Sequence, residues 1–113
     1  MIFVTGPAGG GKLEYIRSLG YSDDQISVGM LSDVPVITDV QDLVMSWDIE
    51  TEELVSLLSG KEVVACDEIG SGIIPFERYM REAREKVGRT AVLLAESADK
   101  VVRVICGIPQ VIK

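Results

Sequence analysis

Histidine is missing from the 113-residue sequence. Because an imidazole is the usual general base beside a serine or cysteine nucleophile, this absence excludes a Ser-His-Asp triad and a Cys-His pair. It also excludes a zinc site with histidine ligands and any reaction that passes through a phosphohistidine or nucleotidyl-histidine. Several large classes of hydrolase and transferase are therefore ruled out.

Positive charge is scarce as well. The chain has 11 Lys and Arg residues against 18 Asp and Glu residues, which gives a net charge of −7. A protein that binds nucleic acid needs a basic stripe or patch to meet the phosphate backbone, and the sequence contains none. We therefore expect no nucleic-acid partner.

Aromatic residues make up only 5% of a sequence that is 47% hydrophobic. The core must then be built from Val, Ile, Leu and Ala, which is typical of a parallel sheet buried on both faces. Cys66 and Cys106 each lie in such an apolar run, and we expect both to be buried, reduced thiols.

Long apolar runs are absent too. No segment approaches the roughly 18 residues that a membrane span requires, and residues 1–4 show no positively charged leader. We therefore expect a cytoplasmic protein with no membrane partner.

The hydrophobic pattern alternates between strand-like and helix-like segments. An irregular segment over 21–33 has room for a short strand at 25–28, and 40–47 has room for one or two helical turns. Strands are predicted at 2–5, 34–38, 62–66, 101–106 and 110–112. Helices are predicted at 12–19, at 51–58 and from Pro75 onward. The last of these helices has an apolar face formed by residues 76, 80, 83, 87, 91, 94 and 98. This alternation predicts one α/β domain over 1–113 with a mostly parallel sheet between helical layers.

A glycine-rich segment follows the first predicted strand and precedes the first helix. Residues 6–12 read Gly6-Pro7-Ala8-Gly9-Gly10-Gly11-Lys12, which fits the G-x-x-x-x-G-K pattern of a phosphate-binding loop. The glycines let successive backbone N–H groups point at phosphate oxygens, and Lys12 would reach the β- and γ-phosphates. The alternative is an ordinary glycine-rich turn, which four glycines within six residues disfavour because each one costs conformational entropy. The fold expected is therefore that of a P-loop NTPase.

Leu13 stands where this pattern normally ends in Ser or Thr, whose hydroxyl ligates Mg²⁺. A leucine side chain cannot bind a metal. Two readings stay open: other groups hold the metal, or the loop binds phosphate without efficient catalysis.

Carboxylates follow two of the predicted strands. Asp67 and Glu68 come directly after residues 62–66, and Asp39 comes directly after residues 34–38. The carboxyl ends of parallel strands share one edge of the sheet, beside the phosphate loop. Asp39 and Asp67 are therefore the candidate metal ligands, and Glu68 is the candidate group that orients or deprotonates a nucleophile. The alternative is that such acids cap the following helices, above all at Asp39.

Four motifs in the second half of the sequence point to a known family. They are Asp67-Glu68-Ile69-Gly70-Ser71-Gly72-Ile73-Ile74-Pro75, the Arg-rich segment 81–89, Ala98-Asp99-Lys100-Val101 and Cys106-Gly107-Ile108-Pro109. Together with the position of the glycine-rich loop, they resemble the bifunctional adenosylcobinamide kinase/adenosylcobinamide-phosphate guanylyltransferase family of cobalamin synthesis. The likeness covers residues 1–19 and about 34–113.

The resemblance implies a P-loop fold, often trimeric, that phosphorylates the aminopropanol arm of a corrinoid with ATP or GTP. It implies that residues 6–12, with Leu13 beside them, bind the nucleotide, that Asp39 stands where the family has an acid on the metal or nucleotide side, and that Glu68 falls on the family's Glu-x-Gly loop. From their own positions, Lys12 and Glu68 are the candidate catalytic residues, and Asp39 and Asp67 are the candidate metal ligands. The family's guanylyl transfer passes through a histidine in a segment that is reduced here to 21–33, so that step is not available. Asp67 also replaces the family's Asn. Two alternatives remain: a shortened relative that binds nucleotide or phosphate without turnover, and a purely structural oligomer with an empty site.

Overall fold

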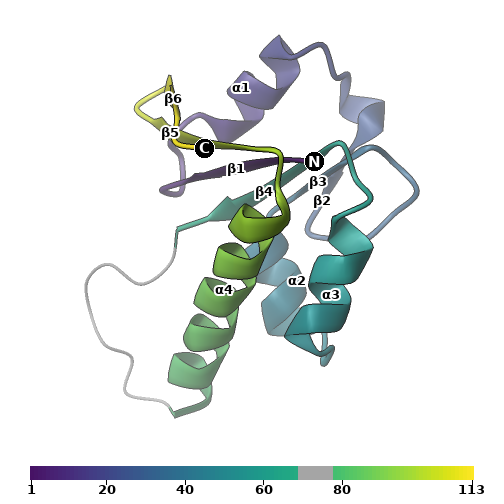
Figure 1. Ribbon diagram of the computed structural model, residues 1–113, viewed down its shortest axis with the longest axis vertical. Helices are drawn as coiled ribbons and strands as arrows, with labels where there is room; N and C mark the ends of the chain where they lie inside the picture. Colours follow the sequence, from purple (N-terminus) through teal and green to yellow (C-terminus); the bar gives the residue numbers. More distant parts are fainter. Residues whose placement is uncertain (69–77) are drawn as a thin grey trace.

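The computed structural model describes residues 1–68 and 78–113. Their strands form one six-stranded sheet in the order β2-β3-β4-β1-β5-β6 (Figure 1). The strands are β1 (Ile2–Gly6), β2 (Ile26–Val28), β3 (Val36–Thr38), β4 (Val63–Asp67), β5 (Lys100–Ile105) and β6 (Ile108–Val111). All neighbours pair in parallel except β5 and β6, which form an antiparallel hairpin. The α/β fold with a mostly parallel sheet is therefore confirmed.

Helices cover both faces of the sheet, but unequally (Figure 1). One face carries α1 (Lys12–Ser18), and a 3₁₀ turn (Asp23–Gln25) follows it in the chain. The other face carries α2 (Val40–Ser46), α3 (Thr51–Leu58) and α4 (Arg78–Ser97). The result is a three-layer domain, as the alternating pattern predicts.

Two apolar cores lie on the two faces. The larger joins the inner sides of α2, α3 and α4 to sheet residues such as Phe3 and Val64. The smaller places Ile16 of α1 against Val4 and Val102. Aliphatic residues dominate both, which confirms the core composition expected from the shortage of aromatics.

Most predicted elements appear with shifted ends. The third strand begins at Val36 rather than at 34, and the last forms over Ile108–Val111 rather than 110–112. Pro75 and Phe76, which the sequence places at the start of the long helix, lie outside the described residues. Met80, expected on the apolar face of that helix, is instead 41% exposed.

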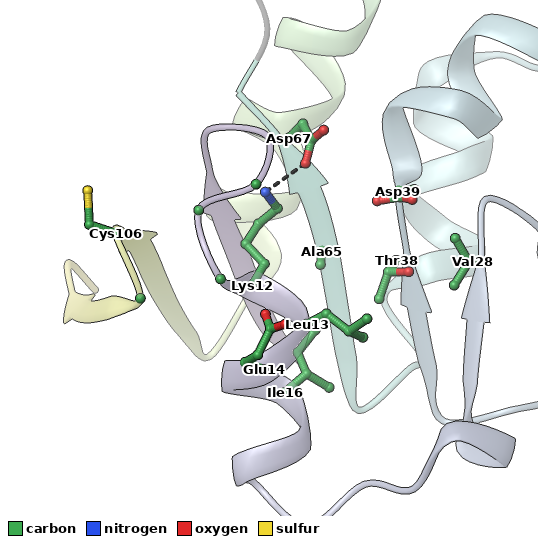
Figure 2. Close-up of a pocket in the computed structure, with 14 residues that line it drawn as sticks. Lys12, Leu13, Glu14, Ile16, Val28, Thr38, Asp39, Ala65, Asp67 and Cys106 are labelled. Atoms are coloured by element: carbon green, nitrogen blue, oxygen red, sulfur yellow. Dashed lines mark ion pairs between the residues drawn. The ribbon is translucent and has the colours of Figure 1, made fainter.

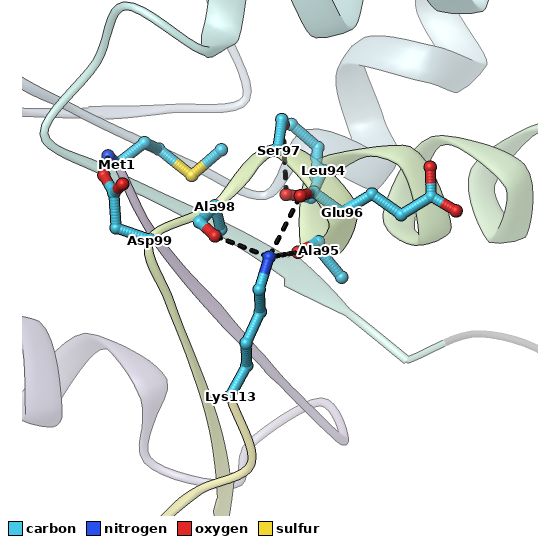
Figure 3. Close-up of polar contacts among 8 residues, drawn as sticks. All are labelled: Met1, Leu94, Ala95, Glu96, Ser97, Ala98, Asp99 and Lys113. Carbon is cyan, nitrogen blue, oxygen red and sulfur yellow. Dashed lines mark hydrogen bonds and ion pairs between the residues drawn. The ribbon is translucent and has the colours of Figure 1, made fainter.

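The last turn of α4 is closed by a lysine from the end of the chain (Figure 3). The Nζ of Lys113 donates hydrogen bonds to the carbonyl oxygens of Ala95 at 3.0 Å, Glu96 at 2.9 Å and Ala98 at 2.8 Å. A cation here satisfies orphan carbonyls and complements the negative end of the helix dipole. This contact ties the end of β6 to α4. Within the part of the chain described, none of the helices is both long and apolar enough to cross a membrane.

Candidate functional site

The segment between β1 and α1 folds into a compact loop. The N–H of Gly10 donates to the carbonyl oxygen of Pro7 at 3.0 Å, and Gly11 caps α1 from a left-handed conformation with φ 100°. From the opposite side, the N–H of Gly107 in the β5–β6 turn donates to the carbonyl oxygen of Gly10 at 2.8 Å. The loop is therefore held by its own turn and by the neighbouring hairpin.

Close packing explains three of the four loop glycines. A Cβ at Gly6 would collide with the carbonyl oxygen of Val104, and one at Gly10 would lie 2.8 Å from the same oxygen. At Gly11 it would lie 2.9 Å from the Cα of Gly107. Gly9, with φ 71°, has nothing within 4 Å of the added carbon and faces open space. Packing thus favours glycine over any other residue at 6, 10 and 11, whether or not phosphate binds.

Lys12 is buried at the base of this loop, with 8% of its surface exposed. Its Nζ donates to the carbonyl oxygens of Gly6 at 3.2 Å and Pro7 at 2.8 Å, and it forms an ion pair with Oδ1 of Asp67 at 2.7 Å (Figure 2). The ion pair links the first turn of α1 to the end of β4. The structure therefore brings together the lysine and one of the carboxylates that the sequence singles out.

A pocket of about 650 Å³ opens in front of the loop. Its polar end holds Lys12, Asp67 and Asp39, while Leu13, Ile16 and Val28 supply apolar side chains (Figure 2). The lining as a whole consists of Gly9, Gly10, Gly11, Lys12, Leu13, Glu14, Ile16, Val28, Thr38, Asp39, Ala65, Asp67, Cys106 and Gly107. These residues come from the loop after β1, from α1 and from the carboxyl-terminal parts of β2, β3, β4 and β5 with the turns that follow them. This is the edge at which open α/β sheets bind ligands.

Asp39 lies between β3 and α2 with an unusual backbone. Its φ of 53° is left-handed, a conformation that is uncommon outside glycine and often found at functional positions. It occupies the N-cap position of α2 but makes no side-chain capping bond. Burial raises the pKa of its carboxyl group, and the negative charges of Asp67 and then Asp42 raise it further. Capping, the alternative role for this acid, is thus not what its side chain does here.

Gln41 links the main chain of Asp67 to the side chain of Asp39, and sequence reasoning missed it. Its Oε1 accepts a hydrogen bond from the backbone N–H of Asp67 at 3.0 Å, and its side chain also hydrogen-bonds Asp39. The residue is 7% exposed. The sequence offers one hint of this role: Gln41 is a polar residue in the first turn of a helix whose other inward-facing residues are apolar.

Glu68 points to a different neighbour. Its carboxylate accepts hydrogen bonds from Nε of Arg103 at 2.6 Å and from a terminal guanidinium nitrogen at 2.8 Å, and it is not among the pocket-lining residues. Hydrogen bonding to Arg103 lowers the pKa of Glu68. Arg103 was not singled out from the sequence, because only the strand order places β5 within reach of the end of β4.

Comparison with known families shows which family the chain belongs to. Residues 24–112 match the family described as cobinamide kinase/cobinamide phosphate guanyltransferase. The chain belongs to this family. Among curated proteins, no individual match was found. Membership in the cobinamide kinase/guanyltransferase family gives the protein a role of that kind in cobalamin biosynthesis, in a family that uses nucleotides and acts on a corrinoid.

The family match covers only part of the candidate site. It contains Asp39, Asp67, Glu68 and Arg103, and it also covers the segment 24–33 that the sequence resemblance left out. The glycine-rich loop lies before it. The assignment of residues 6–12 to phosphate binding therefore depends on their sequence pattern and geometry, independently of the family match.

Cys106 corrects an expectation. It is exposed rather than buried, and it lines the rim of the pocket with a left-handed φ of 52°. The apolar run suggested a strand through 106, but β5 ends at Ile105 and Cys106 begins the two-residue turn to β6. Cys66 is buried as expected, and burial raises the pKa of its thiol to about 12.

The donors present fit a magnesium ion that arrives with phosphates. Mg²⁺ is usually held by one or two carboxylates, water and substrate phosphate oxygens, and Asp39 and Asp67 line the same pocket. Over residues 1–68 and 78–113, no three His, Cys, Asp or Glu side chains gather closely enough to form a site by themselves. The described residues thus suit an ion whose other ligands are water molecules or phosphate oxygens.

Proposed function

We propose that this protein binds ATP or GTP on the loop of residues 6–12, with Leu13 beside it, and transfers the terminal phosphate to a hydroxyl of a corrinoid. The proposal excludes guanylyl transfer by the family's histidine route, because the chain contains no histidine. Within cobalamin biosynthesis the protein would thus perform the kinase step alone. Mg²⁺ would accompany the nucleotide.

One observation carries the proposal: the Nζ of Lys12 lies 2.7 Å from Oδ1 of Asp67 at the polar end of the pocket, directly beside the loop glycines. A lysine and an aspartate that converge at the start of α1 are the parts a phosphate-transfer site needs for positioning and for charge stabilisation. The pocket volume of about 650 Å³ lies within the range usual for small-molecule sites.

The roles of the residues follow from where they lie. The loop amides and Lys12 would hold the β- and γ-phosphates, and the lysine would stabilise negative charge as the terminal phosphate moves. Asp39 and Asp67 would hold Mg²⁺, which neutralises phosphate charge when bound. Glu68 could accept the proton of the attacking hydroxyl only after its carboxylate leaves Arg103.

A second candidate function is a binding module without turnover. Leu13 lines the pocket where a metal-ligating hydroxyl is normal, and Glu68 is paired with Arg103 at 2.6 Å. Both features would weaken catalysis while leaving the phosphate loop intact. The two functions differ in turnover and share nucleotide binding.

Calorimetric titration with ATP and with GTP, each with and without Mg²⁺, tests the shared step. We expect micromolar binding that Lys12→Ala abolishes. The matched control is Arg17→Ala, which removes a positive charge from the outer side of the same helix, where Arg17 pairs with Asp23. If no nucleotide binds, or if Lys12→Ala binds as well as the native protein, the proposal is wrong.

A turnover assay then separates the candidates. With ATP or GTP, Mg²⁺ and adenosylcobinamide, a kinase forms the corrinoid phosphate and the nucleoside diphosphate in equal amounts. Binding without either product identifies the module. Lys12→Ala is again the negative variant, since it removes the group that would stabilise the moving phosphate.

A further inference from the structure

The positive charge of Lys12 is already fully engaged. An ammonium group has three N–H donors, and three acceptors surround its Nζ: the carbonyl oxygens of Gly6 and Pro7 and Oδ1 of Asp67, at 3.2, 2.8 and 2.7 Å. The lysine is also 92% buried, because only 8% of its surface is exposed. A phosphate that enters the pocket therefore meets no free donor on Lys12 until one of these contacts breaks.

Charge in the pocket opposes a phosphate that arrives alone. Among the described lining residues, Lys12 is the single cation, while Glu14, Asp39 and Asp67 are acids. A bare nucleotide would bring several further negative charges next to Asp39 and Asp67. Negative charges that share the partly buried end of a pocket repel one another more strongly than they would in water.

We propose, building on the function above, that Asp67 makes phosphate binding depend on a divalent cation, by holding Lys12 until a cation takes its carboxylate. The cation supplies the positive charge that the pocket lacks and occupies Asp67, which frees one donor of Lys12 for phosphate. Asp67 is then a specificity-determining residue that admits a cation–phosphate complex and rejects phosphate without a cation.

Of the three contacts, the one to Asp67 is the contact that a cation can compete for. The carbonyl oxygens of Gly6 and Pro7 belong to the loop backbone, and the Gly6 carbonyl also accepts the N–H of Glu68 at 2.8 Å. The Asp67 carboxylate has a side chain that is 21% exposed, so an ion in the pocket can reach it. Gln41 holds the backbone N–H of Asp67 at 3.0 Å, so the residue can change partner while its main chain stays in place.

The chemical reactivity of Lys12 tests this without any nucleotide. Acetylation of the purified protein with acetic anhydride is followed by mass spectrometry of the peptide that contains Lys12, with the peptide that contains Lys86 as internal reference. We expect slow reaction of Lys12 in the native protein, several-fold faster reaction in Asp67→Ala, and an intermediate rate in Asp67→Asn. Addition of MgCl₂ alone should accelerate the reaction in the native protein and have no effect in Asp67→Ala.

Glu14→Gln is the matched control, because it removes a negative charge from the same pocket at an exposed side chain with no ion pair to Lys12 among the described contacts. Its Lys12 should react as slowly as in the native protein. Equal rates in the native protein, Asp67→Ala and Glu14→Gln, or no effect of MgCl₂ on the native protein, would overturn the proposal.

Titration with ATP gives the second readout. The native protein should bind ATP far more weakly without Mg²⁺ than with it. Without Mg²⁺, Asp67→Asn should bind ATP about tenfold more tightly than the native protein does, which is the effect expected from removing one negative charge beside the phosphates. Equal native binding with and without Mg²⁺ contradicts the cation dependence but leaves the proposed function intact. Absent binding in every condition defeats the proposed function, and the acetylation rates then decide on the Lys12–Asp67 pair alone.

Discussion

At the scale of single residues, Asp39 combines a left-handed backbone with a carboxylate that faces other carboxylates. Its φ is 53°, and its raised pKa has burial as the main cause and the charge of Asp67 as the next. The raised pKa means that the ionised carboxylate is disfavoured where it lies. Both features agree with the proposed place of Asp39 beside a metal ion.

Replacing Asp39 by Asn should therefore stabilise the empty protein. Asn tolerates the left-handed conformation and carries no charge. Because the folded-state pKa lies above the unfolded value, the native state holds the proton more tightly, and stability falls as pH rises through this range. We expect a gain below about 1 kcal/mol at pH 7, reduced by solvent screening, that disappears below the unfolded pKa near 3.8.

Urea unfolding of Asp39→Asn from pH 3 to pH 8 measures this. Asp42→Asn is the control, since Asp42 is a smaller cause of the raised pKa and should give a smaller gain. A loss of stability at pH 7 would show that the Asp39 charge is compensated in the fold.

Leu13 gives the second prediction at this scale. Leu13→Ser restores the hydroxyl that a phosphate loop normally offers to Mg²⁺. We expect tighter binding of ATP in the presence of Mg²⁺, by about tenfold, and no change without it. Leu13→Ala removes the same bulk without adding a ligand. If Leu13→Ala and Leu13→Ser raise the affinity for ATP equally, the gain comes from the space that the leucine leaves and not from a metal ligand.

At the scale of elements, the β5–β6 hairpin supports the glycine-rich loop of residues 6–12. Gly10 has no positive φ to preserve, but a Cβ there would meet the carbonyl oxygens of Val104 at 2.8 Å and Pro7 at 2.9 Å. Gly10→Ala should destabilise the fold by about 1–3 kcal/mol through overpacking. Chemical denaturation measures the loss, and Gly60→Ala, with nothing within 4 Å, should show no such loss. An unchanged stability of Gly10→Ala would mean that the loop can move away from β5.

Gly88 gives the opposite expectation within α4. Its added Cβ meets nothing within 4 Å, and its φ is not in the left-handed region. Gly88→Ala should stabilise the protein by about 0.5–1 kcal/mol, because alanine loses less backbone entropy in a helix. Thermal unfolding measures this. If Gly88→Ala is less stable than the native protein, position 88 makes a close contact that an added methyl group disturbs.

Local elements were predictable because each depends on a short pattern. The strand at 2–5, the loop at 6–12 and the helix at 51–58 follow from β-branched runs, glycines and helical spacing. Arg103 and Gln41 were not predictable, because their partners come from distant strands whose neighbours only the sheet order defines. The exposure of Cys106 was missed although Cys-Gly before a short strand is itself a turn signal.

At the scale of the whole molecule, the sheet order explains why the candidate site forms where it does. The chain leaves β1 through α1 for the far edge, returns through β3 and β4, and crosses β1 to reach β5. The direction of winding therefore reverses at β1, and the loop that follows β1 opens at this switch point. Residues 39, 67 and 106, far apart in sequence, reach one pocket for this reason.

The family resemblance also predicts a trimer. Light scattering of the purified protein measures the mass directly, against 12.3 kDa for one chain. A mass near one chain at micromolar concentration would contradict the trimer without affecting the site, because all the contacts described for Lys12 lie within one copy.

Binding of nucleotide phosphates on the loop of residues 6–12 is tested most directly by amide ¹H–¹⁵N spectra recorded during titration with ATP and Mg²⁺. We expect saturable shifts that are largest at Gly9, Gly10, Gly11 and Lys12, with smaller ones at Asp39. Unchanged loop amides, or shifts confined to residues away from the loop such as Trp47, which follows α2, would contradict it.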